Sequence, residues 1–338
     1  MKYLSSLLVL FFLSVTTLLS AETQEWLRPT TVPTPSDNTL TKERIALGKL
    51  LFFDVRLSHD DTLSCATCHH PKRGWTDLVP VTKALGFKGK RGPRNSPTLL
   101  NVAYQNRQFW DGRVKTLEAQ ALGPIEAEVE MNMPLETLIP KLNAISGYVE
   151  LFKIAYPNEG LTKESLAKAI ASFERTIVST ESPFDRYIKG DKKAITLDAI
   201  KGFKLFKNKA HCTDCHDSFN FTDGSFHNIG LNDGELQGKE LGRYNVKKRA
   251  AWYGVMKTPT LRDVTKSYPY FHDGSVKTLK EATALCASGG RYEMDVKNKS
   301  TSMKDRKLNE QEIDQIVSFM KTLTGPDLDI IIPTKFPQ

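Results

Sequence analysis

Several features are scarce or absent in this 338-residue chain. Only five cysteines occur. No Arg-rich block interleaved with aromatic residues is present, so nucleic-acid binding is not expected. Long stretches of alternating polar and apolar residues are also missing, which predicts little β-sheet. Beyond one N-terminal apolar run, no segment reads as a membrane span. With so few cysteines, the position of each one is informative.

Four of the five cysteines lie in two Cys-x-x-Cys-His motifs. These are formed by Cys65, Cys68 and His69, and by Cys212, Cys215 and His216. A cysteine pair at this spacing can bond to the two vinyl groups of a haem, and the adjoining histidine then binds the iron. A shared zinc site or a thioredoxin-like redox pair is the alternative, but about 140 residues separate the motifs and each has its own histidine. We therefore expect two covalent c-type haems.

The fifth cysteine, Cys286, has no partner for a disulfide once the other four hold haem. An odd thiol of this kind can be reactive, buried and inert, or a metal ligand.

The N-terminus predicts export. Lys2 precedes an apolar run over residues 3–19, and Ser20 and Ala21 follow it. We expect a signal peptide over residues 1–21 that is cleaved after Ala21, with an uncleaved membrane anchor as the alternative. Either reading puts the folded part outside the cytoplasm, in the periplasm of a bacterium.

The chain repeats itself at a constant offset of 162 positions. Residues 97–117 and 259–279 share 11 identities in 21 positions. Apolar residues recur at helical spacing in each half, a helix is expected over residues 41–53, and Asn309 with Glu312 predicts a helix start. The fold class expected is all-α, with two tandem haem domains over residues 22–180 and 181–338.

The repeat also compares the two haem pockets. The counterpart of Cys286 is Pro124, whose side chain cannot bind iron. If Cys286 lies over the second iron, the first iron is left open on that side. An open iron suits peroxide chemistry, whereas two axial ligands suit electron transfer.

Further motifs give the chain a family resemblance. They are residues 51–58, 94–98, 108–113, 182–187 and 270–274. With these in order around the two haem motifs, the chain resembles the bacterial di-haem cytochrome c peroxidases and their relative MauG, which oxidises a partner protein.

The resemblance implies a role for several residues. The haem on His69 would be the peroxide site, with Gln120 and Glu130 in its distal pocket. Trp110 would lie between the haems and relay electrons. The residues implied for a calcium ion between the haems are Asn95 and the backbone carbonyls of Ser267 and Pro269.

Two positions depart from the family pattern. Many peroxidases of the family carry a histidine in a Gly-His loop that blocks the first iron until the second haem is reduced, and Phe87 stands at that position here. We therefore expect a first haem that is open without reductive activation. Cys286 falls where peroxidases place a methionine and MauG a tyrosine. The alternative ligands for the second iron are Met256, Met294 and Met303.

The leading expectation is a peroxidase that reduces hydrogen peroxide with electrons from a small redox protein, a cytochrome c or a cupredoxin. The formal net charge of +8 suits an acidic partner, although such a charge is also typical of a solvated surface. Two alternatives stay open: a MauG-like oxidase acting on a protein substrate, and a di-haem electron carrier or sensor without turnover. Members of the family are often dimers, but no residue here identifies a homodimer interface.

Overall fold

The computed structural model describes residues 23–79, 81–231, 240–291 and 298–338. The expected signal peptide and Met294 lie outside the described residues. Among the helices of the described residues, none is both long and apolar enough to cross a bilayer.

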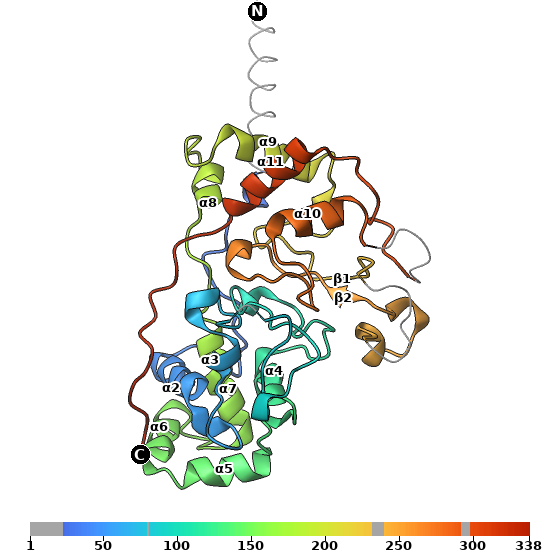
Figure 1. Cartoon of the computed structure of the whole chain (residues 1–338). Coiled ribbons are helices and arrows are strands. Elements are labelled where there is room, and N and C mark those ends of the chain that lie inside the picture. Colours follow the sequence, from blue (N-terminus) through green and yellow to red (C-terminus); the bar gives the residue numbers. More distant parts are fainter. Residues whose placement is uncertain (1–22, 80, 232–239, 292–297) are drawn as a thin grey trace, which may run out of the picture.

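Helices dominate the described chain, which confirms the expected fold class (Figure 1). The first half contains α2 (Lys42–Phe53), α3 (Cys65–Cys68), α4 (Leu117–Glu126), α5 (Leu135–Asn143), α6 (Ser146–Ala155) and α7 (Lys163–Glu174). The second half contains α8 (Pro183–Ile188), α9 (Leu197–Lys207), α10 (Leu279–Ala287) and α11 (Glu310–Lys321). The short strands β1 (Phe226–His227) and β2 (Met256–Lys257) pair antiparallel. Single 3-10 turns connect these elements: η1 (Val55–Leu57), η2 (Pro71–Arg73), η3 (Phe87–Gly89), η4 (Val102–Tyr104), η5 (Cys212–Asp214), η6 (Arg243–Asn245), η7 (Ala250–Trp252) and η8 (Val264–Lys266).

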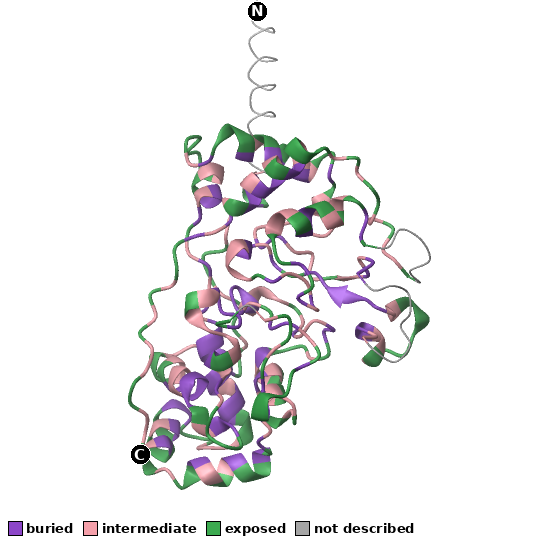
Figure 2. Cartoon of the chain, in the orientation of Figure 1, coloured by how far each residue is buried: buried purple, intermediate pink, exposed green. Residues whose placement is uncertain are grey.

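Each half has its own helical core, and buried residues gather in both lobes (Figure 2). In the first lobe α2 packs against α7 so closely that a Cβ at Gly48 would lie 1.8 Å from the carbonyl oxygen of Ala169. In the second lobe α9 packs against α11 in the same way, and a Cβ at Gly202 would lie 1.9 Å from the carbonyl oxygen of Gln315. Only glycine fits at these two crossings.

The expected helix boundaries are confirmed at two ends. Thr41 caps α2, and its hydroxyl accepts a hydrogen bond from the backbone N–H of Arg44. Asn309 caps α11, where its side chain and that of Glu312 bond reciprocally to each other's backbone N–H.

The sequence repeat is also a structural repeat. Two left-handed residues, Asn101 and Phe109, recur at Asp263 and Phe271, each 162 positions later. The bridge between Gln108 and Val114 recurs between Tyr270 and Val276. Helices α4 and α10 begin at equivalent caps, Thr116 and Thr278. The two haem motifs therefore lie in duplicated surroundings.

The two chain ends cross the expected division between the halves. Trp26, before the first haem motif, packs in the second core against Phe184, Phe203 and Phe221. The C-terminal segment returns to the first lobe and ends beside α6, where the backbone N–H of Gly147 donates to Gln338 at 2.9 Å. Each lobe therefore contains a segment from the other end of the chain.

Removal of the Trp26 ring is expected to destabilise the fold. The side chain is 3% exposed and contacts three phenyl rings, so Trp26→Ala should lower the free energy of unfolding by about 3–5 kcal/mol. Chemical denaturation of the haem-loaded protein measures the change. Leu197→Ala, at a side chain 76% exposed, is the control and should change it by less than about 0.5 kcal/mol. An equal effect of both variants would contradict the packing of Trp26.

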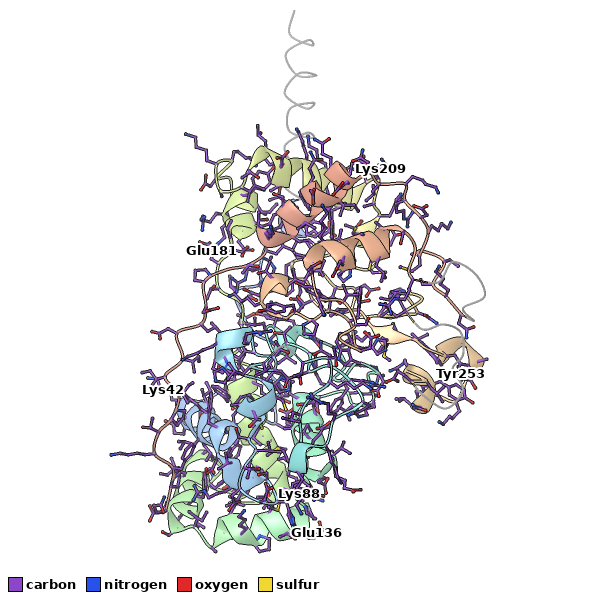
Figure 3. The ribbon with its side chains drawn as sticks, in the orientation of Figure 1. Lys42, Lys88, Glu136, Glu181, Lys209 and Tyr253 are labelled. Atoms are coloured by element: carbon purple, nitrogen blue, oxygen red, sulfur yellow. The ribbon has the colours of Figure 1, made fainter. Side chains whose placement is uncertain are left out.

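The surface carries both signs of charge. Lys42, Lys88 and Glu136 lie at the periphery of the first lobe and Glu181 and Lys209 at that of the second (Figure 3).

Candidate functional site

Both Cys-x-x-Cys-His motifs line one internal cavity of about 650 Å³. The first motif is the single turn α3 and the second the turn η5. Burial raises the pKa of Cys65, and it raises the pKa of Cys68 and of Cys212 to about 12. These thiols stay protonated in the protein alone, as is usual for cysteines in apolar surroundings.

The two motif histidines are held in one tautomer each. The Nδ1 atom of His69 lies 3.1 Å from the carbonyl oxygen of Trp75, and the Nδ1 atom of His216 lies 2.8 Å from that of Phe221. A carbonyl oxygen can only accept, so each Nδ1 carries the proton and each Nε2 keeps a lone pair. Burial lowers the pKa of His69 to about 4 and also lowers that of His216, which keeps both rings neutral. Neutral imidazoles oriented in this way suit iron.

On the His69 side, α4 contributes Gln120 and Pro124 to the cavity wall, one helical turn apart. The Oε1 atom of Gln120 is buried and has no hydrogen-bond partner within the described structure. Glu130 lines the same wall, and burial raises the pKa of its carboxyl group, with a smaller lowering by Arg113. An amide oxygen without a partner and a carboxyl of raised pKa, both lining the same cavity, indicate a polar ligand there.

The loop after the first motif fixes the backbone of Glu130. The N–H of Phe87 donates to the carbonyl oxygen of Glu130 at 2.8 Å. A Cβ at Gly86 would lie 2.0 Å from the carbonyl oxygen of Val129, so this position requires glycine. The ring of Phe87 is buried, packs edge-on against His59 at a centroid distance of 5.2 Å and is not part of the cavity wall.

On the His216 side, Cys286 faces the cavity from the last turn of α10. The exposed part of the Cys286 side chain faces into this cavity. The thiol itself is surrounded by protein, and this burial raises its pKa to about 12. Met256 and Met303 also line the wall, while the third alternative, Met294, lies outside the described residues. The fit to a haem is therefore good at both ends: a cysteine pair, an oriented imidazole and a largely apolar wall.

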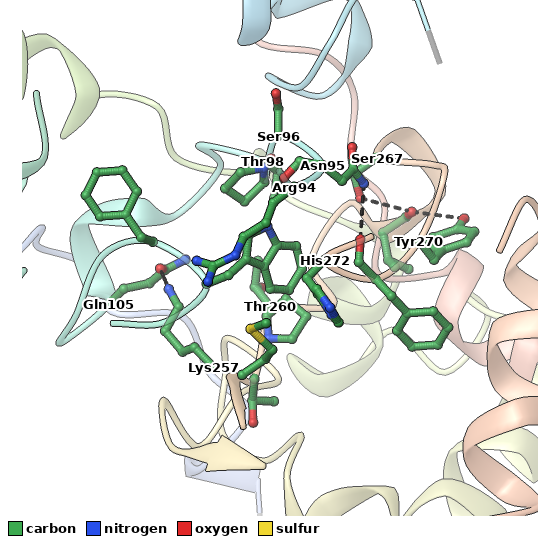
Figure 4. A pocket seen from close by; sticks show the side chains of 18 of the residues that line it. Arg94, Asn95, Ser96, Thr98, Gln105, Lys257, Thr260, Ser267, Tyr270 and His272 are labelled. Carbon is green, nitrogen blue, oxygen red and sulfur yellow. Dashed lines mark hydrogen bonds between the residues drawn. The ribbon is translucent and has the colours of Figure 1, made fainter. Parts of the chain in front are cut away.

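Between the motifs lie two rings at equivalent positions of the repeat. Trp110 and His272 have ring centroids 6.3 Å apart, and the indole N–H of Trp110 donates to the carbonyl oxygen of Asn95 at 2.9 Å. The side-chain NH2 group of Asn95 donates to the carbonyl oxygens of Pro269 at 2.7 Å and Phe271 at 3.3 Å (Figure 4). The predicted relay and calcium residues are thus neighbours.

Comparisons with known proteins identify the family. The model of the di-haem cytochrome c peroxidase family matches residues 42–193, and that of the cytochrome c family matches residues 199–324. The methylamine utilization protein MauG of Methylorubrum extorquens is 42% identical over 90% of this chain and 85% of that protein. The cytochrome c551 peroxidase of Nitrosomonas europaea is 36% identical over 93% of this chain and 88% of that protein. The chain belongs to the di-haem cytochrome c peroxidase family.

Solved structures agree with this assignment. A MauG-like protein associated with microbial copper homeostasis superposes with a TM-score of 0.80 at 30% identity, covering 88% of this chain and 95% of that chain. As a di-haem cytochrome c peroxidase family member, the chain carries two c-type haems.

Two buried titratable groups of this di-haem peroxidase cavity are missing from the sequence-based predictions. Glu174 lies at the end of α7, where burial raises the pKa of its carboxyl to about 8 and its Oε2 atom has no hydrogen-bond partner in the described part of the chain. Its neighbours in sequence are core residues, so no local pattern marks it. Lys257 lies on β2 and is 8% exposed. The sequence repeat could have indicated Lys257, because it is the counterpart of Asn95.

One further cluster belongs to the second haem motif of the peroxidase. Cys215, Asp223 and His227 place ligand atoms within 4.8 Å of one another. Cys215 is one of the motif cysteines and is expected to bond to haem. The other two residues are joined by a hydrogen bond of 2.8 Å between the Nε2 atom of His227 and Asp223. The hydrogen bond to Asp223, followed by one to Cys215, raises the pKa of His227.

Proposed function

We propose that this chain reduces hydrogen peroxide to water at the haem attached to Cys65 and Cys68 and held by His69. A small redox protein supplies the two electrons, which enter at the haem attached to Cys212 and Cys215. The observation that carries the proposal is that a buried amide oxygen without a partner, on Gln120, and a carboxyl whose pKa burial raises, on Glu130, line the same cavity as His69. The peroxidase relatives support the same reaction class.

The side chains at the first pocket have distinct tasks. Haem iron, when bound, supplies the redox centre at which peroxide is reduced. Glu130 takes a proton from one peroxide oxygen and returns it to the oxygen that leaves as water, and burial, by raising the pKa of this carboxyl, makes it a better base for that transfer. Gln120 orients the peroxide through the amide oxygen that no protein group satisfies.

The first pocket is proposed to be open to peroxide without prior reduction. Pro124 occupies the position equivalent to Cys286 and offers no ligand atom. Phe87 turns away from the cavity toward His59. Of the described lining residues between positions 120 and 131, Met131 alone offers a sulfur atom and none offers an imidazole.

Trp110 is proposed to carry electrons between the two halves. Its indole ring faces His272 and is fixed by the hydrogen bond to Asn95. An aromatic ring held in this position can relay electrons as well as fill space.

Calcium is proposed between the haems. Asn95 supplies a side-chain amide oxygen, and Ser267 and Pro269 supply backbone carbonyls, a donor set that suits a hard cation together with water. The side-chain NH2 group of Asn95 donates to the carbonyl oxygens of Pro269 and Phe271, so the Asn95 side chain lies beside one of the proposed carbonyl ligands, which supports this site. We also propose that the protein is periplasmic and that it consists of two domains, over residues 22–180 and 181–338.

A MauG-like oxidase is the second candidate, and Cys286 favours it. A thiolate ligand donates more charge than a thioether and would stabilise ferric iron, which hinders electron uptake from an ordinary donor. The 42% identity to MauG supports the same alternative.

Steady-state turnover tests the proposal. The haem-loaded protein, given hydrogen peroxide and a reduced cytochrome c or cupredoxin, should oxidise two one-electron donors for each peroxide consumed. Peroxide consumption without donor oxidation, together with oxidised Trp or Tyr residues in an added protein, would favour the oxidase.

A further inference from the structure

The duplication relates the proposed calcium residues to a second set in the same cavity region. At the offset of 162, Asn95 corresponds to Lys257. The carbonyl residues correspond as well: Ser267 is the counterpart of Gln105, and Pro269 is the counterpart of Arg107. Each of the three positions of the calcium set therefore has a counterpart in the other half of the repeat.

The backbone at the two sets is held in the same way. The N–H of Asn95 donates to the carbonyl oxygen of His272 at 2.8 Å, and the N–H of Lys257 donates to that of Trp110 at 2.7 Å. Because Trp110 and His272 are themselves counterparts, the two hydrogen bonds are related by the repeat. The sets lie on opposite sides of the central rings, with Asn95 and Ser267 on one side of His272 and Lys257 and Gln105 on the other (Figure 4).

The side chains repeat the geometry of the calcium set. The Asn95 amide reaches the Pro269 carbonyl oxygen at 2.7 Å. The Lys257 ammonium reaches the Arg107 carbonyl oxygen at 3.1 Å and also donates to the Oε1 atom of Gln105. In the second set, the Arg107 carbonyl oxygen, which is the counterpart of the Pro269 carbonyl, thus accepts from a nitrogen cation, and the Gln105 side-chain oxygen is a second acceptor.

Lys257 has no acidic partner among the described residues within ion-pair distance. Its acceptors are neutral, its side chain is 8% exposed, and burial lowers its pKa to about 7. A buried ammonium costs free energy unless a negative group lies nearby, so the carboxylate of a bound haem would stabilise it.

We propose that Lys257 is a built-in cation that replaces, in the second half of the repeat, the divalent metal ion of the Asn95 set. The space between the haems then carries one fixed positive group on each side, a metal ion at Asn95 and an ammonium at Lys257. The inference rests on the proposed calcium site, and its ligand class is the same: a divalent cation bound by amide and carbonyl oxygens.

The test replaces Lys257 by asparagine, the residue that stands at the equivalent position 95 of the first half. Wild type, Lys257→Asn, Asn95→Ala and the double variant are dialysed against calcium, and bound calcium is counted per two-haem chain by atomic emission. We expect one, two, none and one ions, respectively. Lys204→Asn, on the exposed face of α9, is the control and should keep one ion.

The outcomes separate this inference from the calcium proposal. No ion in wild type would overturn calcium at Asn95 and this inference with it. One ion in wild type and one in Lys257→Asn would overturn this inference alone. Two ions in Lys257→Asn that fall to one in the double variant would support it.

A second measurement does not depend on metal uptake. Lys257→Met removes a positive charge near the haems, which disfavours the reduced form. Spectroelectrochemistry should show the ferrous-to-ferric ratio of at least one haem falling about tenfold at fixed potential, equivalent to about 59 mV. In Lys257→Asn, added calcium should restore the potential. Potentials that stay unchanged in Lys257→Met would overturn the proposal.

Discussion

Glu130→Gln is expected to slow the reaction with hydrogen peroxide by about 10²–10⁴-fold, the range that general acid–base groups contribute. The amide keeps the size of the side chain but cannot take and return a proton. Stopped-flow spectroscopy of the first haem measures the rate. Glu128→Gln is the matched control, because its side chain is 80% exposed and bonds to Lys90 at the surface. The control should react like wild type.

The same variant predicts a change in pH dependence. Burial raises the pKa of Glu130, so the basic form is lost as pH falls through a value higher than the pKa of a solvated glutamate. Wild type should therefore lose activity on the acid side at a higher pH than a solvated carboxylate would give. In Glu130→Gln that acid limb should disappear. An acid limb that survives in the variant would assign it to another group, and an unchanged rate would remove Glu130 from the mechanism.

Cys286→Met is expected to raise the midpoint potential of the second haem by a sizeable part of the roughly 0.8 V that axial ligands span in haem proteins. A thioether donates less charge to ferric iron than a thiolate does. Although burial raises the pKa of the free thiol to about 12, a metal ion deprotonates a coordinating thiol. Spectroelectrochemical titration, with the visible spectrum of the ferric protein, measures the effect.

Two variants test the alternative ligands. Met256→Leu and Met303→Leu remove the two alternative ligands that the described cavity lining contains. Both should leave the second haem's spectrum and potential unchanged. A spectral change in either variant, with no change in Cys286→Met, would make that methionine the ligand and Cys286 a buried free thiol.

Local signals in the sequence predict most of the fold. The cap residues Thr41 and Asn309 mark the starts of α2 and α11, and the offset of 162 predicts the equivalence of α4 and α10. The position of Trp26 in the second core could not be predicted, because it depends on contacts with residues more than 150 positions away. Such packing leaves no periodic pattern near the residue itself.

The candidate site also combines features that the sequence predicts with features that only the structure shows. The sequence indicates that Phe87 cannot bind iron, but only the structure shows its ring directed toward His59 and away from the cavity. Lys257 could be found from the sequence alone, because the repeat makes it the counterpart of Asn95. Glu174 had no signal, since a buried carboxyl on a helix of core residues is apparent only once the cavity is known.

The most direct test of the account is stopped-flow mixing of the haem-loaded, as-isolated ferric protein with one equivalent of hydrogen peroxide, followed by a reduced donor protein. The account predicts a rapid spectral change of the first haem without prior reduction, and a fast return when the donor is added. No reaction in the ferric state, with reaction only after reduction of the second haem, would contradict the open first pocket.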